Sequence, residues 1–331
     1  MREAAASAQN ARMHCRPNPW VGAVIVKDGA EVGRGFTSPV GGPHAEIHAL
    51  NAASRRSRGA TIYTTLEPCS HTGRTGPCTK AIIDAGISRV VIGVLDPDSK
   101  VRGTGAEILR QSGIDVEVGV ESDFVAQQLA PYLHHRNTGR PYVIAKMAVT
   151  ADGFVTLGAE TETANRTDND WITGEEARVR VHELRAESDV ICVGAGTVRA
   201  DNPALTVRHV DGLNPLRVVL GDVAQDARVH PCVQWNGELE DMLDHFGAMG
   251  MIQLMVEGGP TVLESFLQAE LVDLLVLHIA PRTAGSGRAL LSRTPWQTVL
   301  GWVNDARVAV ASLGSDTEYA IPRAVFAPSS K

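Results

Sequence analysis

Runs of consecutive apolar residues alternate with helix-like segments along the first half of the chain. The apolar, β-branched runs predict buried strands over residues 21–26, 61–66 and 89–94. The intervening segments favour helices over residues 44–53 and 78–85, and Gly86 is expected to end the second helix. Apolar strands that alternate with helices indicate an α/β fold, in which a mostly buried sheet is covered by helices.

A polar stretch with glycine and proline, residues 136–141, separates this half from a second one. Beyond it the alternation restarts, with helices expected over residues 174–187 and 261–268. Strands are expected over residues 142–149, 189–193, 217–220, 252–256 and 273–280. A chain of 331 residues is long enough for two cores. We therefore expect two α/β domains, residues 1–139 and residues 140–331.

Composition and charge exclude several classes of protein. A content of 44% hydrophobic and 21% charged residues is ordinary for a globular protein, and a net charge of −7 does not indicate nucleic-acid binding. No apolar run approaches the roughly 18 residues of a membrane span, and the first residues lack the apolar core of a signal peptide. The five cysteines are odd in number and scattered, which disfavours a disulfide framework. We expect a cytoplasmic protein that binds neither membranes nor nucleic acids.

The candidate chemistry of the first half lies in His44-Ala45-Glu46, in Cys69 and in Cys78. Zinc favours imidazole nitrogen and thiolate sulfur in tetrahedral geometry, and a catalytic site leaves its fourth position to water. His44, Cys69 and Cys78 supply such a ligand set, in which the bound water would become a hydroxide nucleophile. Glu46 would take the water proton and return it to a departing amine. This is the pattern of a zinc deaminase, whose glutamate is not a ligand.

The expected local structure supports this interpretation. Pro43 should keep the chain extended, so that His44 lies where a loop enters a helix and its side chain can converge with that of Glu46. Cys69 follows a strand end, and Cys78 opens a helix whose N-terminus favours a thiolate. The alternative is a structural zinc site with four protein ligands, for which His71 is the candidate fourth.

The two cysteines are separated by eight residues, where the general signature has two. The loop between them is polar, contains two glycines and carries His71 and Arg74. Because both of its ends are tied to metal ligands, such a loop could close over a substrate. The alternative is an ordinary solvated surface loop.

Longer motifs extend the picture over nearly the whole chain. In the first half they are Pro-Asn-Pro-Trp-Val-Gly-Ala-Val-Ile-Val at residues 17–26, the His-Ala-Glu motif, and Thr-Leu-Glu-Pro-Cys-Ser-His-Thr-Gly-Arg-Thr-Gly-Pro-Cys at residues 65–78. In the second half they are residues 146–153, 171–173, 184–186, 196–208, 256–261 and 279–281. Together these stretches resemble the bifunctional riboflavin-biosynthesis deaminase–reductases. The long loop between the cysteines separates that family from nucleoside and tRNA deaminases.

The resemblance implies a two-step enzyme that acts on a small phosphorylated pyrimidine. A zinc-dependent deaminase would remove the 2-amino group of 2,5-diamino-6-ribosylamino-pyrimidinone 5′-phosphate. A reductase would then use NADPH to open and reduce the ribose to a ribityl chain. The implied folds are a cytidine-deaminase-like α/β/α domain and a dihydrofolate-reductase-like α/β domain. We also expect a homo-oligomer, either a dimer or a tetramer.

The resemblance assigns residues in the deaminase half. Glu46 is the implied catalytic residue, and the implied substrate contacts are Asn18, Ser70, His71 and Arg74. The chain has Asp96-Pro97-Asp98-Ser99 where the family usually has Asp-Pro-Asn-Pro. At Asp98 a carboxylate replaces an amide, which turns a hydrogen-bond donor into an acceptor.

In the reductase half the implied catalytic residue is Lys146, a cation suited to charge that develops on a sugar oxygen. The implied substrate residues are Asn169, Arg185, Leu205, Arg208 and Glu257. The implied cofactor residues are Ala148, Trp171, Thr197, Asp201, Gly259, Pro260 and Thr261. Elementary chemistry agrees in part, because a guanidinium binds a phosphate through two N–H groups and a strand-to-helix turn offers free N–H groups.

Three alternatives remain open. The stretch from Val229 to Ile252 looks shorter than in many family members, with residues 232–235 as its only candidate strand, so reduction could be impaired. A second alternative is a nucleoside or tRNA deaminase with an accessory domain, which the long loop and the acidic charge disfavour. The third is a binding protein with a structural zinc ion, in which Glu46 would have no use.

Overall fold

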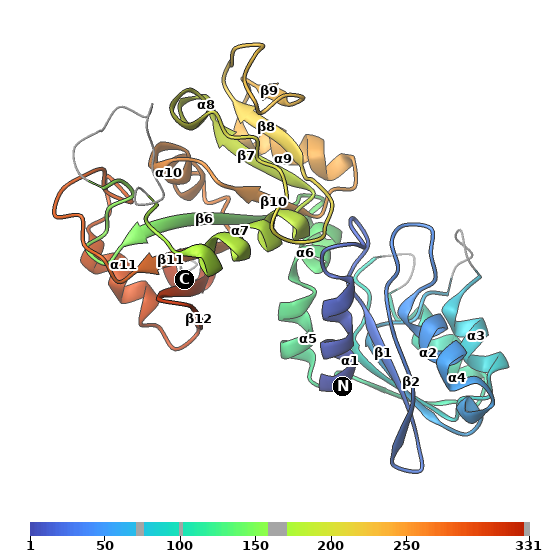
Figure 1. Ribbon diagram of the computed structural model, residues 1–331. Helices are drawn as coiled ribbons and strands as arrows, with labels where there is room; N and C mark the ends of the chain where they lie inside the picture. The colour runs from blue at the N-terminus through green and yellow to red at the C-terminus, as the bar shows by residue number, and fades with distance from the viewer. Residues whose placement is uncertain (71–75, 99–101, 158–170, 328–331) are drawn as a thin grey trace. The chain divides into compact units, whose positions relative to one another are not determined.

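The computed structural model describes residues 1–70, 76–98, 102–157 and 171–327 (Figure 1). The chain divides into two compact units, Met1–Arg140 and Pro141–Lys331, and each is built around its own sheet. In the described part of the chain, no helix is both long enough and apolar enough to cross a bilayer.

A five-stranded sheet in the order β2-β1-β3-β4-β5 forms the centre of the first unit. Its strands are β1 (Gly22–Lys27), β2 (Ala30–Phe36), β3 (Thr61–Leu66), β4 (Arg89–Val94) and β5 (Asp115–Val118). β1 is antiparallel to both β2 and β3, whereas β3, β4 and β5 are parallel to one another. The carboxyl ends of these three strands meet at one edge, where parallel α/β sheets commonly bind their ligands.

Helices cover both faces of this sheet. They are α1 (Arg2–Ala8), α2 (Ala45–Ala53), α3 (Cys78–Asp84), α4 (Thr104–Gln111), α5 (Ser122–Gln128) and α6 (Ala130–Thr138), with 3₁₀ turns η1 (Gln9–Ala11) and η2 (Ser54–Ser57). α1 packs on the face that carries Gly22, and α2 packs on the opposite face, which carries Gly35 (Figure 1). A Cβ atom at Gly22 would lie 1.9 Å from the Ala4 carbonyl oxygen, and one at Gly35 would lie 2.2 Å from that of Ala45. Both glycines are therefore required by close helix–strand packing.

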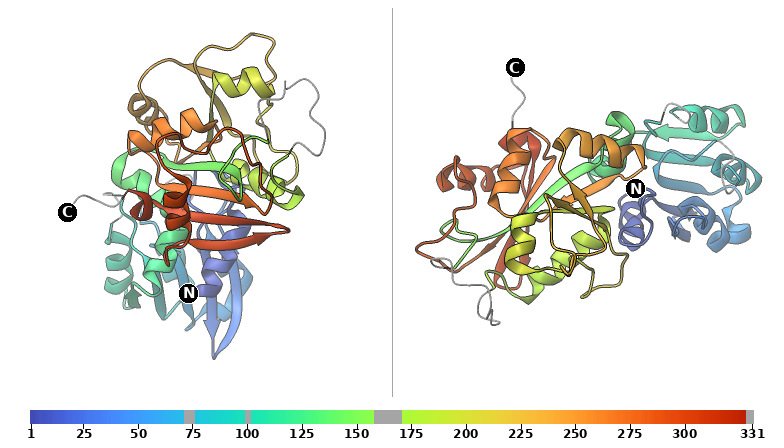
Figure 2. Two further views of the ribbon diagram at one scale, coloured as in Figure 1. Left: turned by 90° about the vertical axis from the view of Figure 1, so that its left-hand side faces the viewer. Right: turned by 90° about the horizontal axis from the view of Figure 1, so that it is seen from above.

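An eight-stranded sheet in the order β12-β13-β11-β6-β10-β7-β8-β9 forms the centre of the second unit. Its strands are β6 (Tyr142–Thr150), β7 (Val190–Gly194), β8 (Leu216–Leu220), β9 (Val233–Trp235), β10 (Gln253–Val256), β11 (Leu274–Ala280), β12 (Ala309–Leu313) and β13 (Asp316–Pro322). The strands from β11 to β9 are parallel. The antiparallel β12–β13 hairpin, drawn in red in Figure 2, forms the edge next to β11.

The helices of the second unit pack on opposite faces of this sheet. They are α7 (Glu175–Glu187), α8 (Ala195–Asp201), α9 (Leu239–Ala248), α10 (Pro260–Gln268), α11 (Trp296–Val303) and α12 (Arg323–Phe326). On one face Phe246 of α9 packs in the same core as Ala145 of β6, together with residues of α10 and α11. On the other face Leu184 of α7 packs against Ile144. Because strand side chains alternate, Lys146 faces the α7 side.

The α/β class expected for both halves is confirmed, and every expected strand and helix is present with ends that differ by no more than one residue. The pattern missed β2, β5 and the β12–β13 hairpin because most of their residues are exposed or only partly buried, so they lack an apolar run. Residues 136–141 are only partly a connection, since α6 continues to Thr138 and just residues 139–141 precede β6.

Candidate functional site

Three side chains from separate elements converge beyond the carboxyl end of β3. His44 is the N-cap residue of α2 and has an extended backbone, Cys69 follows β3, and Cys78 is the first residue of α3. Their ligand atoms all lie within 4.8 Å of one another. The local positions expected from the sequence, a helix entry, a strand end and a helix start, are all confirmed.

The spacing of these atoms fits a tetrahedral zinc ion. His44 Nδ1 lies 3.6 Å from Cys69 Sγ and 3.3 Å from Cys78 Sγ. Tetrahedral Zn–N and Zn–S bonds of about 2.0 and 2.3 Å separate their ligand atoms by roughly 3.5–3.8 Å. Within the described ranges the group contains these three residues. His71, the alternative fourth ligand, lies outside those ranges.

The charge state of the two thiols also suits a cation. The Cys78 backbone N–H donates a hydrogen bond to Cys69 Sγ at 3.3 Å. Hydrogen bonding by the Cys78 thiol lowers the pKa of Cys69 to about 4, while the same contact raises the pKa of Cys78. The hydrogen bond to Cys69 raises the pKa of His44. A bound divalent metal would favour the thiolate form of both cysteines and displace their thiol protons.

Glu46 lies beside the metal-ligand group without belonging to it. It is in the first turn of α2 and its side chain is only 4% exposed. Burial raises the pKa of the Glu46 carboxyl to about 7, and the neighbouring His44 opposes this shift. A carboxyl group that holds or releases a proton near neutral pH suits general acid–base chemistry.

Glu67 is a buried carboxylate that sequence analysis missed. It accepts hydrogen bonds from the backbone N–H groups of Asp96, Gly103 and Ala106, at 3.1, 2.9 and 3.0 Å. These bonds tie the strand end that carries Cys69 to the segment after β4 and to the start of α4. No spacing in the sequence indicates this role, because all three partners lie about 30 to 40 residues downstream.

Asp96 and Asp98 hold the segment after β4. The Tyr132 hydroxyl donates to Asp96 at 2.9 Å, and the Asp98 backbone N–H donates to Asp96 Oδ1 at 2.9 Å. The Asp98 carboxylate lies 3.9 Å from Arg136 Nε. The aspartate that stands in place of the family's asparagine therefore has a nearby cation in this chain.

The expected substrate contacts of the deaminase are described only in part. Asn18 is partly buried in the loop before β1, and its backbone carbonyl oxygen accepts a hydrogen bond from the Cys15 thiol at 3.2 Å. Ser70 directly follows the metal-ligand position Cys69 and is partly buried. His71 and Arg74 lie outside the described residues.

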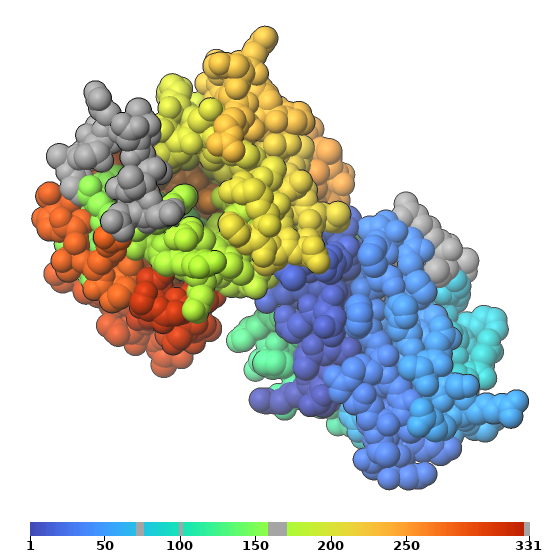
Figure 3. Space-filling model, in the orientation of Figure 1, coloured from blue at the N-terminus to red at the C-terminus, as the bar shows by residue number. Residues whose placement is uncertain are grey.

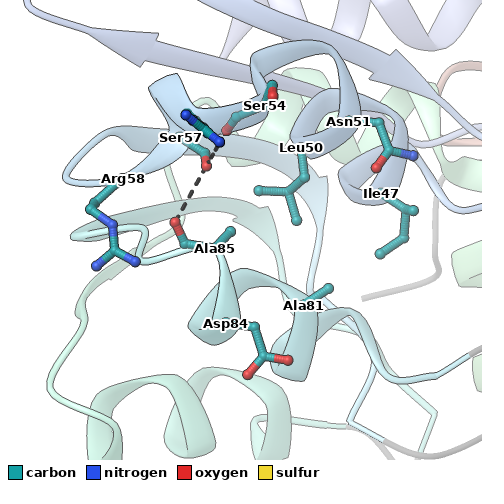
Figure 4. Close-up of a pocket in the computed structure, with 10 residues that line it drawn as sticks. Ile47, Leu50, Asn51, Ser54, Ser57, Arg58, Ala81, Asp84 and Ala85 are labelled. Atoms are coloured by element: carbon teal, nitrogen blue, oxygen red, sulfur yellow. Dashed lines mark hydrogen bonds between the residues drawn. The ribbon is translucent and has the colours of Figure 1, made fainter.

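A pocket in the same unit lies between α2, η2 and α3 (Figure 4). Its lining includes Ile47 and Leu50 of α2, Arg58, and Asp84 at the end of α3. The Ser57 hydroxyl donates to the Ala85 carbonyl oxygen at 3.3 Å across one side of it. None of the site residues expected from the sequence lines this pocket, so it is separate from the metal-ligand group.

In the second unit, the expected substrate residues Arg185 and Glu257 meet each other. Glu257 follows β10, and because Val256 pairs with Ala145, it lies level with Lys146 on the adjacent strand. Arg185 of α7 donates to both Glu257 oxygens, at 2.8 and 2.6 Å. Burial alone raises the pKa of the Glu257 carboxyl, but Arg185 outweighs it and the pKa is lowered. The pair is ionised and fixed beside Lys146.

Lys146 is buried, with 7% of its surface exposed. Among the described residues its ammonium belongs to no ion pair. Burial lowers the pKa of Lys146 to about 8, against the opposing influence of Glu257. A buried cation without a close counter-ion is costly and is characteristic of functional sites.

Basic side chains gather around Arg208, whose pKa is lowered by burial and by the nearby cations Arg185 and Arg228. The segment after α8, drawn in yellow, lies at the surface of the second unit beside α7 (Figure 3). There the Arg208 backbone N–H donates to His182 Nδ1 at 3.1 Å, and the His182 ring packs edge-on against His209. Burial, with Arg185, Arg208 and His209 nearby, lowers the pKa of His182 to about 4. Such a cluster suits an anionic group such as a phosphate.

His182 is the second residue near the sites that sequence analysis missed. Its signal was its position three residues before Arg185, which places both side chains on one face of a helix. Leu205, expected to contact substrate, is buried and has a positive φ of 52°. Asn169, also expected to contact substrate, lies outside the described residues.

The residues expected at the cofactor come from several elements. The Gly259 N–H donates to Thr197 Oγ1 at 3.3 Å, which joins two of them. Pro260 is the first residue of α10, and the Thr261 hydroxyl accepts a hydrogen bond from Arg288 at 2.6 Å. This confirms that residues 258–261 run from a strand into a helix.

The other three expected cofactor residues come from β6, from α8 and from the segment before α7. Ala148 lies on β6 and Asp201 is the last residue of α8. Trp171 is exposed, with the Arg178 guanidinium 5.5 Å from its ring centroid.

Comparison with known proteins places both units in one family. The model of the RibD C-terminal domain matches residues 141–317, and that of the cytidine and deoxycytidylate deaminase zinc-binding region matches residues 1–94. The riboflavin biosynthesis protein RibD of Escherichia coli K12 is 38% identical over 331 residues, which cover 87% of this chain and 88% of that relative. The chain belongs to the riboflavin-biosynthesis deaminase–reductase family. It is therefore a two-activity enzyme of riboflavin biosynthesis.

Other members of the deaminase–reductase family agree. The RibD of Corynebacterium ammoniagenes is 39% identical over 314 residues, 91% of this chain and 90% of that relative. The solved structure of Acinetobacter baumannii RibD matches this chain with a TM-score of 0.83 and 31% identity. That of a Thermotoga maritima deaminase/reductase matches with a TM-score of 0.79 and 33% identity. Each match covers 97% of this chain and 97% of the solved chain. The expected folds, cytidine-deaminase-like and then dihydrofolate-reductase-like, are confirmed.

Proposed function

We propose that the first unit removes the 2-amino group of 2,5-diamino-6-(5-phosphoribosylamino)pyrimidin-4-one. We propose that the second unit then reduces the ribosyl chain of the product with NADPH. The proposal agrees with the Thermotoga maritima relative, which is a diaminohydroxyphosphoribosylaminopyrimidine deaminase and 5-amino-6-(5-phosphoribosylamino)uracil reductase.

The convergence of His44, Cys69 and Cys78 beside the buried carboxyl of Glu46 is the observation that carries this proposal. A binding protein with a structural metal has no use for a buried acid of raised pKa at this position. The cluster of cations around Arg208 supports a phosphorylated substrate in the second unit.

In the deaminase, His44, Cys69 and Cys78 would hold the zinc ion. When bound, zinc lowers the pKa of a coordinated water toward neutral. Glu46 takes a proton at its carboxylate and returns it to the departing amine, for which a pKa near 7 is well matched. Glu67 keeps the Cys69 strand end in place through its three backbone hydrogen bonds.

In the reductase, Lys146 acts on the sugar. When bound, NADPH supplies the hydride. Opening of the ribosylamine breaks the bond between C1 and the ring oxygen and leaves C1 double-bonded to the amine nitrogen. The Lys146 ammonium would stabilise the negative charge that develops on the departing ring oxygen, while C1 is the carbon that would accept the hydride. Arg208 anchors the substrate phosphate, and the Arg185–Glu257 pair orients the groups beside Lys146.

The two activities belong to separate parts of the chain in this proposal, a deaminase domain of residues 1–139 and a reductase domain of residues 140–331. The two matched family models support this division, because they end and begin on opposite sides of residue 139. We also propose a homo-oligomer in the cytoplasm, where the five cysteines, all free in the structure, would remain reduced.

Product identification tests the two-step proposal directly. Purified protein incubated with the diamino substrate alone should release ammonia and stop at the deaminated ribosyl compound. With NADPH, the ribityl compound should form with matching NADPH consumption. Deamination of cytidine or of tRNA in preference to the diamino compound would favour the alternative deaminase.

Loss of one ligand should remove the metal. Cys78→Ala is expected to lower zinc from one equivalent per chain to a small fraction, since two remaining protein ligands bind zinc far more weakly. Metal analysis of the purified proteins measures this, with Cys232→Ala as the matched control because Cys232 lies in the other unit. A full equivalent of zinc in Cys78→Ala protein would exclude this ligand assignment.

The second unit should bind NADPH in the micromolar range. The stretch from Val229 to Ile252, which looked abbreviated in sequence, contains β9 and α9, and β9 completes the parallel part of the sheet. Titration of the protein with NADPH, followed by fluorescence, measures the affinity. Absence of binding at millimolar NADPH in folded protein would show that the second unit has lost its reductase role.

A further inference from the structure

Three buried polar side chains lie together on the α7 side of the second sheet. His278 Nε2 of β11 is 2.9 Å from Glu318 Oε2 of β13, and Arg180 Nε of α7 donates to the same oxygen at 3.2 Å. Their side chains are 0%, 12% and 18% exposed, respectively. We call His278, Glu318 and Arg180 the His278 network. The proposed reduction uses none of the three.

The strand register puts this network on the same face as Lys146. Val276 pairs with Lys146 and His278 pairs with Ala148 across β11 and β6, while His278 pairs with Glu318 across β11 and β13. Paired residues, and residues two apart on one strand, point to the same face. Lys146 and His278 are therefore diagonal neighbours, close enough for long side chains to interact.

The network carries an excess of negative charge. Besides Glu318, Arg180 also donates to Glu183 at 2.8 Å and to Glu187 at 3.2 Å, so one guanidinium faces three carboxylates. Burial raises the pKa of Glu318, but His278 and Arg180 outweigh it and the pKa is lowered, which keeps the carboxylate ionised. Burial lowers the pKa of His278, so its imidazole is neutral at neutral pH.

The other charges that face Lys146 largely cancel or lie further along the strand. Glu257, after β10, is neutralised by Arg185 of α7. Asp316, at the start of β13, accepts the Gly174 N–H at 2.7 Å. Asp316 thus also keeps its charge, and Glu318 is the nearer to Lys146 of these two buried carboxylates on the face.

The second ring nitrogen of His278 also favours a nearby cation. Its Nδ1 atom is buried and has no hydrogen-bond partner among the described residues. With the proton on Nε2 shared with Glu318, Nδ1 carries a lone pair that can only accept. This lone pair makes no hydrogen bond to Lys146, but the ammonium is close enough to act electrostatically on the imidazole, and the negative end of the ring dipole favours a positive charge nearby.

We propose that Glu318 is a positioning residue of the reductase: held by His278 and Arg180, its carboxylate keeps the buried ammonium of Lys146 charged at the pH of catalysis. This inference rests on the proposed role of Lys146 in reduction. Burial favours the neutral amine, and the excess negative charge beside it opposes that tendency. The protonated form is present below the pKa of Lys146 and is lost as the pH rises through it, so removal of the carboxylate should move that loss to lower pH.

The pH profile of reduction tests this. We would measure kcat/KM for the deaminated ribosyl phosphate at saturating NADPH from about pH 5.5 to about 9.5, because kcat/KM then reports the ionisations of the enzyme–NADPH complex before the sugar phosphate binds. In the unmodified protein it should fall as the pH rises through about 8. In Glu318→Gln the fall should occur about one unit lower, giving values about five-fold below those of the unmodified protein at pH 8 and equal to them near pH 6.

Two companion variants separate charge from packing. Glu318→Asp retains the charge and should restore the profile of the unmodified protein. Glu183→Gln removes a carboxylate from the same guanidinium, but at its partly exposed end, where solvent screens the charge. It should leave the profile unchanged. An unshifted profile in Glu318→Gln, or an equal shift in Glu183→Gln, would overturn the proposal.

Two further measurements keep the test decisive. The NADPH dissociation constant reports whether the second unit of each variant still folds. If Glu318→Gln does not fold, His278→Leu takes its place and should shift the pH profile in the same direction by a smaller amount. An unshifted profile in His278→Leu would then count against the network. Lys146→Met distinguishes the underlying assignment. If Lys146→Met reduces substrate normally, the proposed role of Lys146 is wrong. If Lys146→Met does not reduce substrate and the Glu318→Gln profile is unshifted, the role of Lys146 stands and only the proposed role of Glu318 is rejected.

Discussion

Glu46→Gln is expected to retain one zinc ion per chain and to lose deamination by roughly 10²-fold or more, the scale of general acid–base catalysis. Glutamine preserves the size and burial of the side chain but can neither take up nor release a proton. Glu46 is outside the group of three ligand atoms, so the metal site should survive the change. Ammonia release from the diamino substrate measures the effect, and metal analysis shows whether zinc remains.

The same protein supplies its own controls. Reduction of supplied deaminated substrate should be unaffected in Glu46→Gln, because Lys146 and its partners belong to the other unit. Glu107→Gln makes the same chemical change at an exposed position on α4 and should leave both activities intact. Near-normal deamination by zinc-loaded Glu46→Gln protein would rule out a proton-transfer role for this residue.

Lys146→Met should abolish reduction almost completely, with a loss in kcat of roughly 10² to 10³-fold, as found when a group that stabilises developing charge is removed. Methionine fills the buried space of the lysine stem but carries no charge, so the effect should come from the missing ammonium. Arg185 and Glu257 remain paired with each other and should keep the neighbouring strand end in place. NADPH oxidation in the presence of deaminated substrate measures the loss.

Ammonia release in Lys146→Met should equal that of the unmodified protein. NADPH binding should also persist, since Lys146 is proposed to act on the sugar rather than on the nucleotide. If both activities fell together in a folded Lys146→Met protein, a single shared site would be favoured over two. A rate of reduction near that of the unmodified protein would instead remove Lys146 from the mechanism.

The metal-ligand group of the deaminase could be predicted from sequence because each member occupies a locally determined position. His44 and Cys78 stand at the starts of helices, and Cys69 lies just after the end of a strand, so short-range signals place all three. The strands were predictable for a similar reason, because a run of apolar β-branched residues is buried on both faces of a parallel sheet. The exposed β12–β13 hairpin carries no such run and was missed.

The supporting contacts could not be predicted in the same way. Glu67 depends on backbone N–H groups from Asp96 to Ala106, and nothing in the composition of those residues marks them as donors to a carboxylate. Arg185 was expected to anchor a phosphate, and its bidentate pairing with Glu257, 72 residues away, is visible only in the folded unit. His278 and Glu318 likewise meet because β11 and β13 are neighbours in the sheet.

The sequence alone determined the two-part α/β organisation and the candidate metal-ligand group with Glu46 beside it, because these follow from local periodicity and from the chemistry of short motifs. Tertiary structure decided the electrostatic surroundings of Lys146. β6 lies between β10 and β11, although both strands come more than 100 residues later in the chain. That strand order places Glu257 level with Lys146 and places Glu318 on the same face of the sheet as Lys146. The free energy of a buried charge depends on neighbours in space such as these, and not on the residues adjacent to it in sequence.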